Sequence, residues 1–109
     1  MANIAEQIVD MLVKAGVKRI YAVTGDSLNK INDAVRKDGR IQWIHVRHEE
    51  TGAFAAGAEA QLHGNLACCA GSSGPGHVHL INGLYDAHRS GAPVLAIAST
   101  IISGEFGTT

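Results

Sequence analysis

The feature that most constrains the fold is an alternation of short apolar runs with longer segments of helical periodicity. The apolar runs lie at 19–23, 41–46, 66–70 and 93–98, and the helical segments lie at 4–13, 28–36, 49–62 and 77–89. Such an alternation predicts parallel strands joined by right-handed helical crossovers. We therefore expect an α/β domain whose parallel sheet carries helices on both faces. The runs are apolar throughout, which predicts that every strand is covered on both sides.

Composition limits the possible partners. Charged residues make up only 17% of the 109 residues, against about 25% in an average protein, so we expect part of the surface to be covered by another chain or domain. The net charge is −1 and there is no basic stripe interleaved with aromatic residues, which excludes nucleic acid as a predicted partner.

The chain carries no signal-peptide pattern behind Met1, and its longest apolar stretch, 93–102, is about half of the roughly twenty residues that span a bilayer. We expect a cytoplasmic location, with peripheral attachment to the inner membrane face left open for a full-length protein. Cys68 and Cys69 are adjacent in a strand-like run, so their side chains should point to opposite faces of the sheet. This favours a reduced, buried pair.

In parallel sheets of this kind, ligands bind in the loops at the carboxyl ends of the strands. The four such loops are 24–27, 47–49, 71–76 and the residues from 99 onward, and every distinctive motif of the chain falls in or beside them. This edge of the sheet is therefore the predicted site.

Glu49 is the candidate catalytic residue because it stands between a strand and an Ala/Gly-rich helix. A helix N-terminus favours the ionised carboxylate, whereas burial favours the neutral acid. A balance of the two suits a carboxyl group that exchanges a proton. The alternative is that Glu49 and Glu50 only decorate the first helical turn, and spacing alone does not decide between them.

The helix after Glu49 has almost no side-chain volume between 53 and 60. Such a helix can pack closely against a partner subunit, or it can be buried inside the domain. The low charge content makes a subunit contact at least as good an expectation.

The loop at 71–76 contains Gly74-Pro75-Gly76 but fits neither the dinucleotide fingerprint, since His79 replaces its third glycine, nor the P-loop. It is either a backbone-lined loop that lets a flat ligand approach or a tight turn. No metal ligand set is predicted, because Gly52 removes an HExxH motif and because His77 and His79 should not share a helix face.

Several segments together resemble the thiamine-diphosphate-dependent enzymes of the pyruvate oxidase and acetolactate synthase superfamily. They are Ala15 to Ile20, Val23 to Asn29, Arg47 to Glu50, Ala55 to Ala60, Gly74 to Gly76 and His79 to Ala87. The resemblance implies that 1–109 is a flavodoxin-like, N-terminal pyrimidine-binding domain, truncated at its C-terminal end, with a loop-like tail at 103–109. It also implies FAD-binding and diphosphate-binding domains outside this chain.

The resemblance further implies the site residues. Glu49 would hydrogen-bond N1′ of the aminopyrimidine ring and promote removal of the proton from C2 of the thiazolium ring. Thr24, Gly25, Gly74 and His79 would line the cofactor site. The implied cofactors are thiamine diphosphate, Mg²⁺ and FAD, the latter two held by regions outside this chain.

Within the superfamily, His79-Leu80-Ile81-Asn82-Gly83 resembles pyruvate oxidase and the quinone-linked pyruvate dehydrogenase branch, whereas acetolactate synthases usually have Asn in place of His79. The implied substrate is pyruvate, the electron acceptor is quinone or oxygen, and a second subunit of a homodimer or homotetramer completes the site. The alternatives are a non-oxidative enzyme such as acetolactate synthase, or a non-catalytic α/β partner-binding module. The fragment alone is predicted to be inactive.

Overall fold

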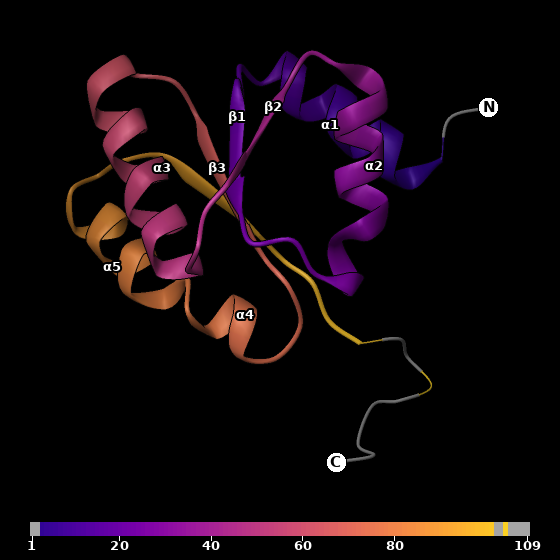
Figure 1. Ribbon diagram of the computed structural model, residues 1–109. Coiled ribbons are helices and arrows are strands. Elements are labelled where there is room, and N and C mark those ends of the chain that lie inside the picture. Colours follow the sequence, from indigo (N-terminus) through magenta and orange to yellow (C-terminus); the bar gives the residue numbers. More distant parts are fainter. Residues whose placement is uncertain (1–2, 102–103, 105–109) are drawn as a thin grey trace.

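A four-stranded parallel sheet forms the centre of the computed structural model, which describes residues 3–101 and 104 (Figure 1). The strands are β1 (Arg19–Ala22), β2 (Gln42–His45), β3 (Ala67–Gly71) and β4 (Val94–Ala98). The helical elements are α1 (Ile4–Lys14), the 3₁₀ turn η1 (Asp26–Leu28), α2 (Asn29–Asp38), α3 (Glu49–His63), α4 (Pro75–Val78) and α5 (Ile81–Arg89).

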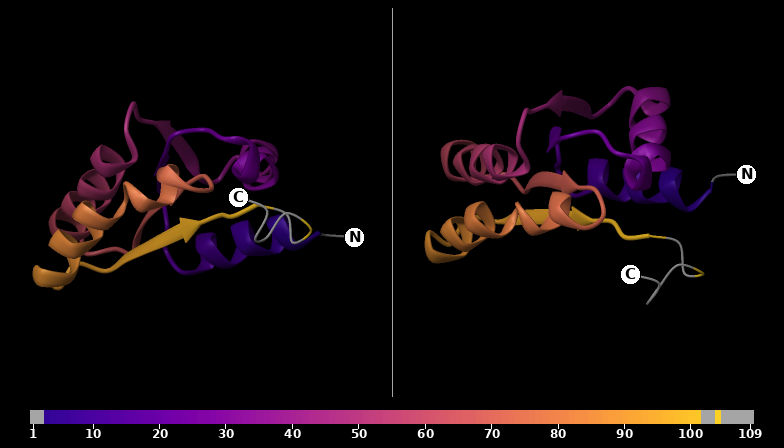
Figure 2. Two further views of the ribbon diagram at one scale, coloured as in Figure 1. Left: turned by 90° about the horizontal axis from the view of Figure 1, so that it is seen from below. Right: turned by 60° about the horizontal axis from the view of Figure 1, so that its bottom comes forward.

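The strand order is β2-β1-β3-β4, and all three neighbouring pairs are parallel. Helices α1 and α2 pack together on one face, and α3 and α5 pack together on the other (Figures 1 and 2). The predicted α/β class, with a parallel sheet and helices on both faces, is confirmed.

The two faces of the sheet bury two separate apolar cores. Cys68 lies in the core beneath α1 and α2, while Cys69 lies in the core beneath α3 and α5. Both thiols are free and buried, and burial raises the pKa of each to about 12. The predicted buried, unpaired cysteines are confirmed, and neither thiol has the thiolate character needed for reactivity.

Local signals explain the helix boundaries. The Asn3 side chain accepts a hydrogen bond from the Glu6 amide at 2.8 Å, an N-cap that starts α1. Helix α3 is capped after His63 by Gly64, whose φ of 72° places it in the left-handed region that glycine adopts at little cost. Val9 and Leu12 then bury the inner face of α1 against the sheet.

The helix predicted at 77–89 is wrong in detail, because the structure divides this segment into α4 and α5. At the junction the Leu80 amide donates to the His77 carbonyl, a bond from residue i to i−3 that tightens the turn. The Leu80 side chain is only 1% exposed, so burial of this side chain accompanies the tight turn. The predicted loop at 71–76 is also shorter, since β3 includes Gly71 and α4 begins at Pro75.

The expectation that all strands are covered on both sides is wrong for two of them. Every residue of β3 is buried and β1 alternates buried with half-buried residues, but β2 and β4 contain exposed positions. Their place at the two ends of the strand order explains the difference, because each has only one neighbouring strand among the described residues.

Most small residues of α3, among them Ala53, Ala56, Gly57 and Ala60, pack inside the domain, while Ala55 is half-buried and Ala58 is exposed. Gly83 of α5 faces Ala53, and Gly57 of α3 faces Ala87, so the two helices approach through residues without bulk. The expectation of a helix buried inside the domain therefore accounts for the buried small residues, and the subunit contact stays a prediction.

The loop-like tail predicted at 103–109 lies outside the described residues except for Gly104. Within the described part of the chain, no helix is long and apolar enough to cross a membrane.

Candidate functional site

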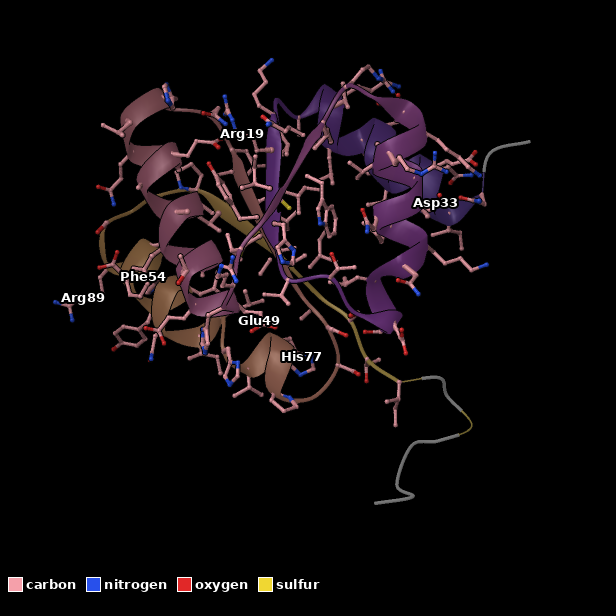
Figure 3. All side chains as sticks on the ribbon, in the orientation of Figure 1. Arg19, Asp33, Glu49, Phe54, His77 and Arg89 are labelled. Atoms are coloured by element: carbon pink, nitrogen blue, oxygen red, sulfur yellow. The ribbon has the colours of Figure 1, made fainter. Side chains whose placement is uncertain are left out.

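Glu49 is the first residue of α3, at the carboxyl edge of the sheet. The preceding residue, His48, is the N-cap, and its Nδ1 accepts a hydrogen bond from the Glu50 amide at 3.1 Å. Nδ1 therefore carries no proton, and a neutral His48 ring holds its proton on Nε2. Figure 3 shows Glu49 at the end of α3, close to α4 and His77. Its side chain is 12% exposed, so the carboxylate borders solvent without being open to it.

His79 is the nearest ionisable partner of Glu49. Its Nδ1 lies 3.2 Å from Oε1 of Glu49, and its side chain is 43% exposed. The His48 ring stacks on the His79 ring with centroids 4.4 Å apart. The fold thus joins the start of α3 to the turn between α4 and α5, and it brings together two of the predicted site residues.

A glycine at the start of α4, just after the loop that follows β3, lies beside this carboxylate. A Cβ placed on Gly76 would lie 3.3 Å from Oε2 of Glu49, closer than side chains normally pack. A Cβ on Gly25 would collide with the side chain of Ser72. The loops after β1 and β3 therefore touch, and a residue without a Cβ is needed at Gly25, while a Cβ at Gly76 would only press on the end of the Glu49 side chain.

The remaining predicted residues are more peripheral. Thr24 and Gly74 are exposed residues of these same loops, and in the described part of the chain no hydrogen bond joins either of them to Glu49. A role for Thr24, Gly25, Gly74 and His79 toward a cofactor stays a prediction.

A chain of serine hydroxyls, which the sequence reasoning missed, ties three strand ends together. Ser27 Oγ lies 2.8 Å from Ser72 Oγ and 2.6 Å from Ser99 Oγ, and it accepts from the Ser73 amide at 3.0 Å. Ser99 donates its only hydroxyl proton to the Gly71 carbonyl at 3.1 Å. Ser27 must therefore donate to Ser99 and accept from Ser72. Ser27 is the hub of these hydrogen bonds, and it fixes the loop after β3, which lies next to Glu49.

Replacing Ser27 with Ala is expected to lower the free energy of unfolding by about 1–3 kcal/mol, because the Ser73 amide and the other hydroxyls lose a partner in a half-buried place. Chemical denaturation measures the change. The matched control is Ser90→Ala at the exposed end of α5, for which we expect a change within about 0.5 kcal/mol. Equal effects of the two substitutions would contradict the role of Ser27 as a hub.

Glu59 is a second acidic residue that the sequence reasoning missed, and its role is structural. It is 5% exposed and accepts hydrogen bonds from Tyr21, Arg19 and Asn65 at 2.9, 3.2 and 2.8 Å. Burial alone would raise the pKa of Glu59, but these hydrogen bonds outweigh it and lower the pKa below its ordinary value. The available signal was its position next to Ala60, on the small-residue face of the helix.

The site also contains a group of three potential metal ligands. One ligand atom each from His48, Glu49 and His79 lies within 4.8 Å of the others. The sequence reasoning tested only ligand pairs close in sequence and missed this group, because His79 comes from a segment thirty residues beyond Glu49.

Comparisons with known proteins agree with this architecture. Residues 2–108 match the family described as thiamine pyrophosphate enzyme, N-terminal TPP binding domain. The chain is 64% identical over 109 residues to the "Uncharacterized 42.6 kDa protein in isoamylase 3'region" of Pseudomonas amyloderamosa, covering 98% of this chain and 28% of that protein. It is 48% identical over 103 residues to a pyruvate oxidase of Lactiplantibacillus plantarum, covering 94% of this chain and 16% of the relative.

An acetolactate synthase of Bacillus subtilis is 36% identical over 101 residues, covering 93% of this chain and 18% of the enzyme. The chain thus spans less than a third of the length of each of these relatives. Since the family match covers nearly every residue, the chain belongs to the thiamine pyrophosphate enzymes and forms their N-terminal TPP binding domain.

Proposed function

We propose that this chain is the pyrimidine-binding part of a thiamine-diphosphate- and flavin-dependent enzyme that oxidatively decarboxylates pyruvate. The observation that carries the proposal is the Glu49 carboxylate, held at the sheet edge against His79 and against Gly76 at the start of α4. The cofactor, when bound, supplies a carbon nucleophile and accepts the electron pair left by decarboxylation.

The residues around Glu49 suit an aminopyrimidine ring. The Glu49 side chain is largely shielded, with 12% of its surface exposed at the sheet edge where the ring would lie. Gly76 presents backbone rather than a side chain beside Oε2. In this arrangement Glu49 exchanges a proton with the ring nitrogen N1′, which is the role of a general acid–base group.

His79 holds the second oxygen of the carboxyl group. Its Nδ1, 3.2 Å from Oε1, fixes the direction in which the carboxyl group presents Oε2. His79 is therefore a positioning residue, and its exposed ring also forms part of the wall of the site. Thr24, Gly25 and Gly74 would complete this wall from the loops after β1 and β3.

The rest of the site comes from outside this chain in the proposal. An FAD-binding domain and a diphosphate-binding domain with Mg²⁺ would follow residues 1–109, and a second subunit of a homodimer or homotetramer would cover the cofactor. Exposed apolar side chains around α3, α4 and α5 support such a contact. They are Phe54, Leu62, Val78, Ile81 and Tyr85.

The oxidative reaction is favoured over the non-oxidative one by similarity. Identity to the pyruvate oxidase is 48%, against 36% to the acetolactate synthase over a similar span. His79, which contacts Glu49, is also the residue on which the resemblance to the oxidase branch rests. Quinone or oxygen would then accept the two electrons from the flavin.

Anaerobic addition of pyruvate to the full-length protein tests the reaction. We expect the oxidised flavin absorbance to bleach, with acetate and carbon dioxide as products, because two electrons leave the substrate and enter the flavin. Acetolactate formation with a flavin that stays oxidised would instead assign the chain to a non-oxidative enzyme. A protein that binds neither cofactor would favour a non-catalytic partner-binding module.

A further inference from the structure

We propose that His48, Glu49 and His79 form a binding site for one Zn²⁺ ion, and that this ion excludes thiamine diphosphate from the carboxylate. The three residues come from the start of α3 and from the turn between α4 and α5, and they offer two imidazole nitrogens and one carboxylate oxygen. Two His and one Glu form a ligand set that zinc uses where a fourth position stays open.

One existing distance is close to that of a zinc site. Two ligand atoms that each lie about 2.1 Å from a tetrahedral ion are about 3.4 Å apart. Nδ1 of His79 and Oε1 of Glu49 are already 3.2 Å apart, so an ion can replace the shared proton with little movement of either side chain. The third ligand atom lies within 4.8 Å of the others. The exposed His48 ring must therefore turn toward the ion, and this turn gives up its cap bond to the Glu50 amide and its stacking on the His79 ring.

Zinc binding through His48 changes the start of α3. Nδ1 of His48 now accepts from the Glu50 amide. If Nε2 binds the ion, the ring proton moves to Nδ1 and the cap bond is lost; if Nδ1 binds the ion, it no longer accepts from the amide. The metal therefore exchanges one helix cap for one ligand bond, and an Asn at this position would keep the cap without the imidazole.

The competition with cofactor rests on the proposed function. A carboxylate bound to Zn²⁺ cannot at the same time share a proton with N1′ of the aminopyrimidine. Saturating thiamine diphosphate should therefore weaken zinc binding at this site, and zinc should raise the cofactor concentration needed for half-saturation.

The test is a titration of the metal-stripped, full-length protein with zinc chloride. A chromophoric chelator competes for the ion and reports the zinc affinity. We expect at least tenfold weaker binding at one site in each of His48→Asn, Glu49→Gln and His79→Asn. The matched control is His63→Asn, which removes an exposed imidazole from the other end of α3 and should bind like the wild type. Co²⁺ reports the geometry, because its intense tetrahedral absorption should appear in the wild type and disappear in the three variants. Circular dichroism checks that each variant is folded. If another variant is unfolded, the comparison of His48→Asn with the wild type decides the outcome.

Comparison between variants removes the contribution of any metal site elsewhere in the protein. Equal zinc affinity in the wild type, His48→Asn and His79→Asn would overturn the proposal, as would an equal loss in His63→Asn. Zinc binding that thiamine diphosphate does not weaken would overturn the competition. Failure of zinc to bind leaves the pyruvate test unaffected, so the two proposals fail separately.

Discussion

Replacing Glu49 with Gln is expected to lower the rate of pyruvate turnover by about 10²–10⁴-fold, the usual contribution of a general acid–base group. The amide preserves the shape of the side chain and can still accept a hydrogen bond from His79, which lies 3.2 Å away. It cannot release or take up a proton near neutral pH. We therefore expect kcat to fall with little change in the affinity for the cofactor. Steady-state rates of the full-length protein at saturating thiamine diphosphate measure the effect.

Glu50→Gln is the matched control, because it makes the same change on the adjacent residue. Glu50 accepts a hydrogen bond from Asn82 at 3.2 Å, and a Gln side-chain carbonyl can accept the same bond. We expect this variant to keep the wild-type rate within about threefold, since an exposed hydrogen bond contributes little. A larger loss in Glu50→Gln than in Glu49→Gln would reverse the assignment of the two carboxylates.

Replacing Gly83 with Ala is expected to lower the free energy of unfolding by about 1–3 kcal/mol or more, because it overpacks the contact between α3 and α5. The added Cβ would collide with the Cβ of Ala53 and lie 2.8 Å from two backbone atoms of α3, the carbonyl carbon of Ala53 and the amide nitrogen of Phe54. Backbone atoms cannot turn aside, so the helices must separate. Urea denaturation, monitored by circular dichroism, measures the change.

Gly57→Ala is the same substitution at the same pair of helices, with the opposite expected sign. Its Cβ would meet the Cβ of Ala87 at 3.6 Å, an ordinary contact. Ala is more favourable than Gly inside a helix by about 0.5–1 kcal/mol, so we expect the variant to be stabilised by that amount. If both variants changed stability in the same direction, the packing described for α3 and α5 would be wrong.

The element order could be predicted from the sequence because each strand is a short apolar run and each long helix has its own helical period. The spacing of Val9 and Leu12 predicts a helix, and the apolar run around Cys68 predicts a buried strand. Neither prediction depends on any other segment of the chain. The split between α4 and α5 could not be predicted, since it accompanies burial of Leu80 among residues of other elements. The exposure of β2 and β4 likewise depends on strand order, which short apolar runs do not encode.

The sequence predicts the location of the candidate site, at the carboxyl edge of the sheet, but not the side-chain contacts within it. The spacing placed Glu49 at the end of a strand, and the resemblance added His79. The hydrogen bonds that Ser27 forms with Ser72 and Ser99 join segments that are 45 and 72 residues apart. No local pattern marks such partners, because a serine that caps a turn and a serine that joins loops look alike in sequence. The group of His48, Glu49 and His79 could not be predicted for the same reason, since His79 is distant in sequence from the other two residues.

Exchange of the C2 proton of bound thiamine diphosphate with deuterium tests the role of Glu49 most directly, because it requires no pyruvate, flavin or electron acceptor. Quenched-flow exchange followed by NMR would compare the wild type with Glu49→Gln and Glu50→Gln at equal cofactor occupancy. We predict that only Glu49→Gln slows the exchange, by about 10²–10⁴-fold. Exchange at the wild-type rate in Glu49→Gln would contradict the assignment of Glu49 as the proton-transferring group.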